Sequence, residues 1–133
     1  MRRKSRELAL KLLFQSEFSE PLRLDELLKT QDSSVEFSAD VQLYAKELIH
    51  GVQENRSEID KVIQQFSSNW KIDRMATIDR NLLRVAIFEL KFATTPLSPS
   101  IIINEAIEIA KIYGGTDSSS FVNGILDQVA RSL

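Results

Sequence analysis

The stretch "LLRVAIFELKF", residues 82–92, decides how this chain of 133 residues folds. Its apolar side chains would cover almost every face of a helix. A helix that is apolar nearly all round is stable only when other elements bury it. The stretch therefore predicts the central helix of a helical bundle. Arg84, which lies within it, must be paired with an opposite charge if it is buried.

Amphipathic patterns of helical period flank this central segment on both sides. The run Ile101–Ile103 also has β-propensity, but a single strand would have no partner with which to pair. We therefore expect an all-α single domain, residues 1–133, of about six or seven helices. The helices other than the central one are expected over residues 5–18, 22–29, 41–55, 57–66, 98–113 and 117–130.

Capping signals mark several of the helix ends. Ser38 and Thr77 are predicted N-caps, and Asp117 or Ser118 is predicted to cap the last helix. The pair Gly114-Gly115 is expected to end the preceding helix in the left-handed conformation that glycine tolerates.

The composition excludes several classes of protein. No run of about 18 apolar residues is present, so no transmembrane helix is expected, and the basic start lacks the pattern of a signal peptide. Cysteine is absent, which excludes disulfides and thiolate chemistry and fits a reducing cytoplasm. His50 is the only histidine, so the usual nitrogen and sulfur ligands of zinc are missing. We therefore predict neither an enzyme nor a metal or cofactor site.

The start of the chain, "MRRKSREL", concentrates positive charge. Residues 1–6 carry a charge of +4, whereas the rest of the chain carries −6. Cations are disfavoured at the first turn of a helix, by about 0.3–1 kcal/mol each at low salt. A phosphate backbone would gain from both the cations and the free N–H groups of that turn. The arrangement favours a nucleic-acid partner, although a solvated chain end remains an alternative.

Two further segments have residues suited to binding. In "TDSSSFVNGILD", residues 116–127, Phe121 is either a core residue or a ring that stacks on an unpaired RNA base. Gly124 within the same helix suggests that another backbone approaches closely, because glycine there costs roughly 1 kcal/mol against alanine. In "RMATIDRNLLR", residues 74–84, Asp79 and Arg80 either face a partner or pair internally.

Four blocks together resemble one family in order and over almost the whole chain. They are "RRKSRELALKLLFQ", "DRNLLRVAIFEL", "INEAIEIAKIYG" and "DSSSFVNGILD", and the family is NusB. The resemblance implies two three-helix bundles plus an extra helix, no enzymatic activity, and a pairing with the ribosomal protein NusE. It also implies that the pair binds the boxA element of ribosomal RNA leader transcripts. With other Nus factors and RNA polymerase, it would act in transcription antitermination.

The resemblance also implies roles for particular residues. Two departures from the family pattern are Ser5, where alanine is frequent, and Ser100, where lysine is frequent. The second removes a charge, so the loop before Ser100 is left out of the expected RNA site. The expected RNA contacts are Arg2, Arg3, Lys4, Arg6, Asp117, Ser118 and Phe121, and the expected NusE contacts are Phe14 and Asp79.

The sequence leaves open two alternative functions and the oligomeric state of the free protein. A NusB-like domain also begins certain ribosomal RNA cytosine methyltransferases, and a helical interaction module without an RNA role is a further alternative. The free protein could form a homodimer through the surface that it would offer to NusE.

Overall fold

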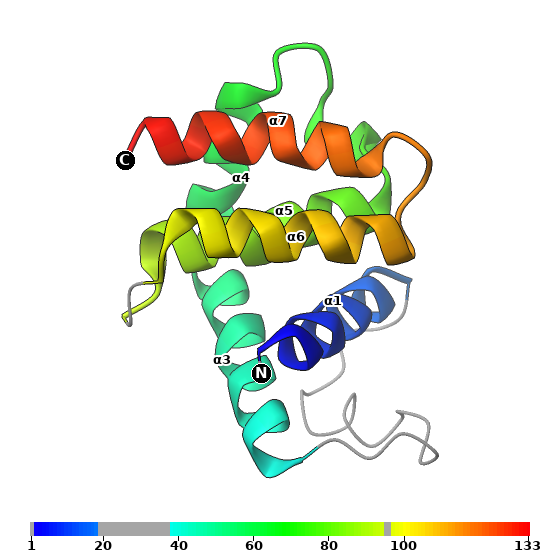
Figure 1. Ribbon diagram of the computed structural model, residues 1–133. Coiled ribbons are helices and arrows are strands. Elements are labelled where there is room, and N and C mark those ends of the chain that lie inside the picture. The colour runs from blue at the N-terminus through cyan, green and yellow to red at the C-terminus, as the bar shows by residue number, and fades with distance from the viewer. Residues whose placement is uncertain (1, 19–37, 95–96) are drawn as a thin grey trace.

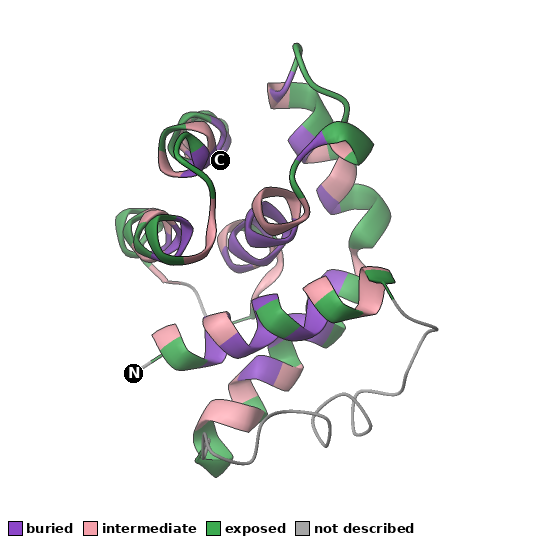
Figure 2. Ribbon diagram, turned by 90° about the vertical axis from the view of Figure 1, so that its right-hand side faces the viewer, coloured by how far each residue is buried: buried purple, intermediate pink, exposed green. Residues whose placement is uncertain are grey.

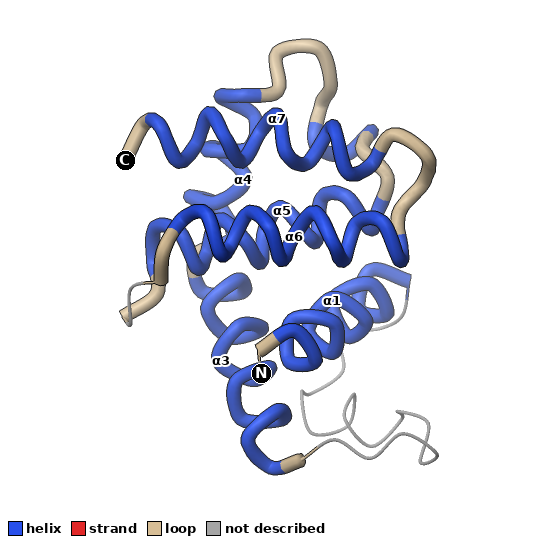
Figure 3. Tube along the Cα trace, in the orientation of Figure 1, coloured by secondary structure: helices blue, strands red, loops and turns tan. Residues whose placement is uncertain are grey.

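The computed structural model describes residues 2–18, 38–94 and 97–133, and all regular structure in these ranges is helical (Figures 1 and 3). The all-α fold is thereby confirmed. The helix expected over residues 22–29 lies outside the described residues. None of the described helices combines the length and the apolarity needed to span a membrane. The elements are α1 (Arg3–Phe18), α3 (Ala39–Glu54), α4 (Arg56–Phe66), η1 (Ile72–Arg74), α5 (Thr77–Ile87), η2 (Phe88–Phe92), α6 (Pro99–Tyr113) and α7 (Ser118–Arg131).

Helix α5 is the centre of the molecule, as the sequence predicts. Every residue from Asn81 to Ile87 is buried. Helices α1 and α3 pack against α5 as one layer, while α4, α6 and α7 surround it on its other sides (Figure 1). The buried residues follow the faces that these helices turn toward one another (Figure 2).

The predicted helix starts are correct in part. The Ser38 hydroxyl accepts a hydrogen bond from the Val41 N–H at 3.2 Å and so caps α3. The prediction for Thr77 is wrong, because Thr77 is the first residue of α5 and Ala76 holds the cap position without a side-chain bond to the helix. Asp117 occupies the cap position of α7, but its carboxylate makes no capping bond to that helix.

Close contacts explain the glycine at position 114 but not the one at position 124. The expected left-handed end of α6 is wrong, since Gly114 has a φ of −91° and no described glycine has a positive φ. A Cβ on Gly114 would lie 2.4 Å from the Ser118 Cβ and 2.7 Å from the Ala110 carbonyl oxygen, so only glycine fits. The close approach expected at Gly124 is absent: apart from its chain neighbours and the backbone of its own helix, no described atom lies within 4 Å of where its Cβ would be.

The central segment changes its winding at Phe88. Residues Phe88–Phe92 form a π-helical turn, a rare feature that often marks functional sites. The turn places Glu89 in the interior, where the residue is 4% exposed. It also sets the Phe88 ring against Gly51, where any Cβ would lie 2.1 Å from a ring carbon.

An ion pair fixes the beginning of α1 to this π-helical turn. The Arg6 guanidinium donates to both carboxylate oxygens of Glu89, at 2.6 and 2.8 Å. The Tyr44 hydroxyl of α3 donates to the same carboxylate at 2.7 Å. Burial opposes the charge on Arg6, but the hydrogen bond and charge of Glu89 outweigh it and raise the pKa of Arg6.

A second group of charges fixes the end of α1 to the start of α5. Arg80 and Asn81 donate to the Glu17 carboxylate, and the Arg84 guanidinium lies 3.5 Å from it. Burial alone would raise the pKa of Glu17, but the hydrogen bonds from Arg80 and Asn81 lower it. Arg84 also donates to Asp60 of α4 at 2.9 Å, so the expected pairing of this buried arginine is confirmed.

The ion pair between Arg6 and Glu89 yields a test of stability. Arg6→Ala leaves a carboxylate buried without its counter-charge, and we expect a loss of about 3–5 kcal/mol in the free energy of unfolding. The double variant Arg6→Met with Glu89→Leu removes both charges and should recover most of this loss. Urea denaturation of the two variants measures the difference. A single variant within 1 kcal/mol of the unaltered chain would contradict the structural role.

Candidate nucleic-acid interface

The cations at the start of the chain differ in their exposure and in their intramolecular partners. Arg2 and Lys4 are exposed. Arg3 donates to Glu105 of α6 at 2.6 Å and keeps a side chain that is 38% exposed. The Arg2 guanidinium lies over the Tyr44 ring, 4.2 Å from its centroid. Intramolecular partners therefore offset part of the unfavourable placement of these cations at the N-terminus of α1.

Two residues expected at the RNA site are buried. Arg6 is 5% exposed, and Glu89 occupies its guanidinium. Ser118 is 4% exposed, and its hydroxyl accepts from the Gly115 N–H at 2.8 Å. Neither side chain is available to a ligand in this structure. Arg6 fixes α1 in place, and Ser118 shapes the turn between α6 and α7.

The turn between α6 and α7 borders a hollow of about 560 Å³ on the side of η1. Asp117 is exposed there, and Phe121 is half-buried and packs against the core. Asp79 also lines the hollow, and its Oδ1 is buried without a hydrogen-bond partner among the described residues. The lining residues are Trp70, Arg74, Met75, Ala76, Asp79, Gly115, Thr116, Asp117, Ser118 and Phe121.

The structure does not bring the two parts of the expected RNA site into one cluster. Helix α1 lies along α6, because Arg3 pairs with Glu105 and the Tyr113 hydroxyl donates to Glu7 at 2.8 Å. Tyr113 follows Glu105 by eight positions, which is about 12 Å along the helix. The N-terminus therefore lies beside the middle of α6, whereas the turn before α7 follows the C-terminal end of α6 (Figure 1). Only an extended ligand would contact both.

Two exposed aromatic side chains extend the candidate surfaces beyond the sequence prediction. Phe18 is 68% exposed, and its ring centroid lies 4.9 Å from that of Phe14. Trp70 is 57% exposed at the edge of the hollow that contains Asp79. The spacing of Phe14 and Phe18, four residues apart on one helix, could have indicated the pair. No local signal distinguished Trp70 from a core residue.

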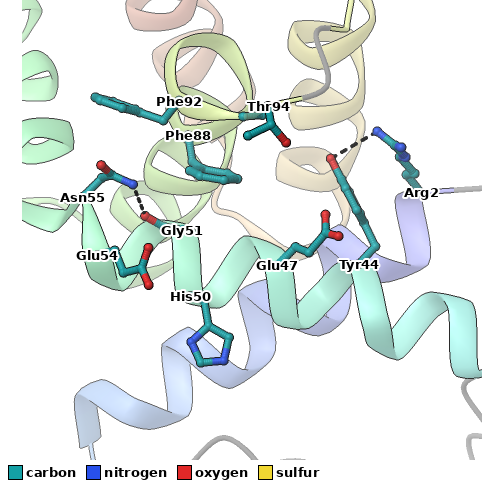
Figure 4. A pocket seen from close by; sticks show the side chains of 11 residues that line it. Arg2, Tyr44, Glu47, His50, Gly51, Glu54, Asn55, Phe88, Phe92 and Thr94 are labelled. Atoms are coloured by element: carbon teal, nitrogen blue, oxygen red, sulfur yellow. Dashed lines mark hydrogen bonds between the residues drawn. The ribbon is translucent and has the colours of Figure 1, made fainter.

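A second hollow, of about 280 Å³, lies between α3 and the π-helical turn (Figure 4). His50 and Glu54 border it, and Phe88 and Phe92 contribute aromatic rings. The described residues contain no group of histidine and carboxylate side chains arranged to hold a metal ion. The described surface offers exposed cations, aromatic rings and single carboxylates.

The fold and the exposed groups define an all-helical binding protein, and the chain is similar to known proteins of one such family. The chain is 49% identical over 131 residues to the transcription antitermination protein NusB of Bdellovibrio bacteriovorus, covering 98% of this chain and 96% of that protein. It is 43% identical over 135 residues to the NusB protein of Myxococcus xanthus, covering 99% and 96%. The NusB family model matches residues 3–131, and the chain belongs to the NusB family.

Solved structures show the same fold. T. maritima NusB superposes with a TM-score of 0.86 at 39% identity, covering 98% of this chain and 91% of that one. A crystallised complex of the antitermination factors NusB and NusE with double-stranded RNA contains a chain with a TM-score of 0.84 and 25% identity. That match covers 99% of this chain and 97% of the other.

Proposed function

We propose that this chain is a transcription antitermination factor that pairs with NusE and binds boxA-containing RNA of ribosomal RNA leaders. The observation that carries the proposal is the match to the NusB family over residues 3–131. The solved complex of NusB and NusE with RNA, which shares this fold, supports both partners. The factor would act in the cytoplasm, with other Nus factors and RNA polymerase, and would catalyse no reaction.

The proposed RNA surface begins at the exposed cations of the N-terminus. Arg2 and Lys4 would contact phosphates directly, and Arg3 retains donors beyond the one that Glu105 uses. Beyond the C-terminal end of α6, Phe121 would stack on an unpaired base, and the Asp117 carboxylate would accept a hydrogen bond from a base N–H. Arg6 and Ser118 contribute by holding this surface in shape.

The proposed NusE surface lies where α1 ends and α5 begins. The contacts of Glu17 with Arg80 hold these two helix ends together, so Phe14 and Asp79 belong to the same end of the molecule. The exposed Phe18 ring adds apolar area next to Phe14. The unpartnered oxygen of Asp79 is suited to accept a hydrogen bond from a donor that NusE brings.

The cations at the N-terminus should govern the salt dependence of RNA binding. We expect the double variant Arg2→Ala with Lys4→Ala to bind boxA-containing RNA more weakly in the presence of NusE. Each lost phosphate contact should lower the slope of log affinity against log salt by about 0.7. Filter-binding titrations at several salt concentrations measure the slope. Lys61→Ala, an exposed lysine of α4, serves as the control, and an unchanged slope in the double variant would exclude phosphate contacts at the N-terminus.

Variants of Phe121 distinguish a ring that packs in the core from a ring that stacks on an RNA base. Phe121→Ala should lose both stability and RNA affinity, because the half-buried ring contacts the core. Phe121→Leu should restore stability by filling the same space, yet bind RNA more weakly by about 1–3 kcal/mol, because leucine has no flat face for a base. Phe121→Tyr should retain both. Thermal melts and RNA titrations compare the three, and full RNA affinity in Phe121→Leu would make Phe121 a packing residue only.

Asp79 tests the NusE surface. Asp79→Asn keeps the shape of the side chain and breaks no hydrogen bond at Oδ1, so the melting temperature should change little. Its affinity for purified NusE, measured by calorimetry, should fall because the carboxylate charge is lost. Asp127→Asn, on the exposed side of α7, is the matched control. Undiminished binding by Asp79→Asn would remove Asp79 from the interface.

A further inference from the structure

Arg2 is held by Tyr44, a residue that neither the sequence pattern nor the family match assigns to RNA binding. The guanidinium carbon of Arg2 lies 4.2 Å from the centroid of the Tyr44 ring. Its NH1 group also donates to the Tyr44 hydroxyl at 3.3 Å (Figure 4). These two contacts confine a long side chain that would otherwise sample many rotamers at the end of the chain.

We propose that Tyr44 is a positioning residue that holds the Arg2 guanidinium in place to receive a phosphate of the bound RNA. This inference rests on the proposed function and deepens it, since Tyr44 acts through Arg2 and does not itself contact RNA.

Tyr44 can position Arg2 because Tyr44 is itself anchored. Its hydroxyl donates to Glu89 at 2.7 Å, and Glu89 is in turn fixed by two hydrogen bonds from Arg6. Burial and the contact with Glu89 raise the pKa of Tyr44 to about 12, which moves the loss of its proton still further above neutral pH. The orientation of Arg2 thus traces back to the buried ion pair.

The stacked guanidinium remains able to bind a phosphate. Arginine carries five N–H donors in one plane, and the bond to the tyrosine hydroxyl uses one of them. Stacking covers a face of that plane and leaves the edge free for the paired hydrogen bonds that phosphate accepts. Arg2 and Tyr44 line two hollows, of about 280 and 420 Å³, so solvent and ligands reach the stack from two directions.

The expected benefit is a smaller loss of entropy on binding. Immobilising a flexible side chain at an interface weakens binding by roughly two- to tenfold. A guanidinium that is already held avoids most of this loss. The same reasoning predicts that lysine at position 2 replaces arginine poorly, because an ammonium group has no plane with which to stack and cannot form the paired bonds.

A double-mutant cycle tests whether Tyr44 acts through Arg2. Tyr44→Leu is made both in the unaltered chain and in the Arg2→Ala variant. Binding of boxA-containing RNA is measured with NusE present, and thermal melts report the stability of each variant. We expect Tyr44→Leu to weaken binding roughly two- to tenfold when Arg2 is present. It should cause no further loss after Arg2→Ala. Equal losses in both backgrounds, or tighter binding by Tyr44→Leu, would overturn the proposal.

Two conservative variants keep the test decisive if Tyr44→Leu does not fold. Tyr44→Phe preserves the ring but removes both hydroxyl hydrogen bonds, so it should lose less RNA affinity than Tyr44→Leu. Arg2→Lys leaves the interior untouched and should lose about as much affinity as Tyr44→Leu is expected to lose. Arg2→Lys with the affinity of the unaltered chain, or Tyr44→Phe with the loss expected of Tyr44→Leu, would contradict positioning by the ring.

The other tyrosine of the chain supplies a matched control. Tyr113 also donates to a carboxylate of α1, that of Glu7 at 2.8 Å, but it does not contact Arg2. Any effect of Tyr113→Leu on RNA affinity should therefore be the same with arginine or alanine at position 2. If the unaltered chain with NusE fails to bind RNA, the proposed function fails. If it binds but Arg2→Ala has no effect, the phosphate contact of Arg2 and the role of Tyr44 are refuted, and the proposed function stands.

Discussion

The buried ion pair between Arg6 and Glu89 is the interaction on which the arrangement of the N-terminal half depends. Burying two charges is unfavourable unless the geometry is good and the remaining polar atoms are satisfied. Here both oxygens of Glu89 accept from Arg6, and Tyr44 adds a third donor. The pair joins α1 to the π-helical turn, and Tyr44 attaches α3 to the same carboxylate, so moving any of these elements apart would break a buried hydrogen bond.

A second set of charges makes the attachment of α1 two-sided. Glu17, near the end of α1, receives donors from Arg80 and Asn81 at the start of α5. The helix is thereby fixed at both ends to the central segment. This arrangement connects stability to function, because the exposed cations lie at one end of α1 and the rings of Phe14 and Phe18 lie at the other.

The four cations at the start of the chain have different physical roles, although they form one cluster in the sequence. Arg6 is structural, Arg3 is shared between an ion pair with Glu105 and solvent, and Arg2 is stacked on Tyr44. Lys4 is exposed to solvent. A cluster of cations that appears uniform in the sequence therefore separates into internal anchors and surface groups. The π-helical turn decides this division, because it directs Glu89 inward to meet Arg6.

The sequence by itself determined the all-helical fold, the central position of residues 82–92, the cap at Ser38 and the need to pair Arg84. These features follow from hydrophobic period, capping chemistry and the unfavourable burial of charge, which act locally. Tertiary structure alone decided which charges meet, since Arg6 and Glu89 are 83 residues apart and Arg80 and Glu17 are 63 apart. It also decided the need for glycine at position 51, because the Phe88 ring occupies the place of a Cβ there. Contacts of this kind depend on how the helices pack, which no local pattern encodes.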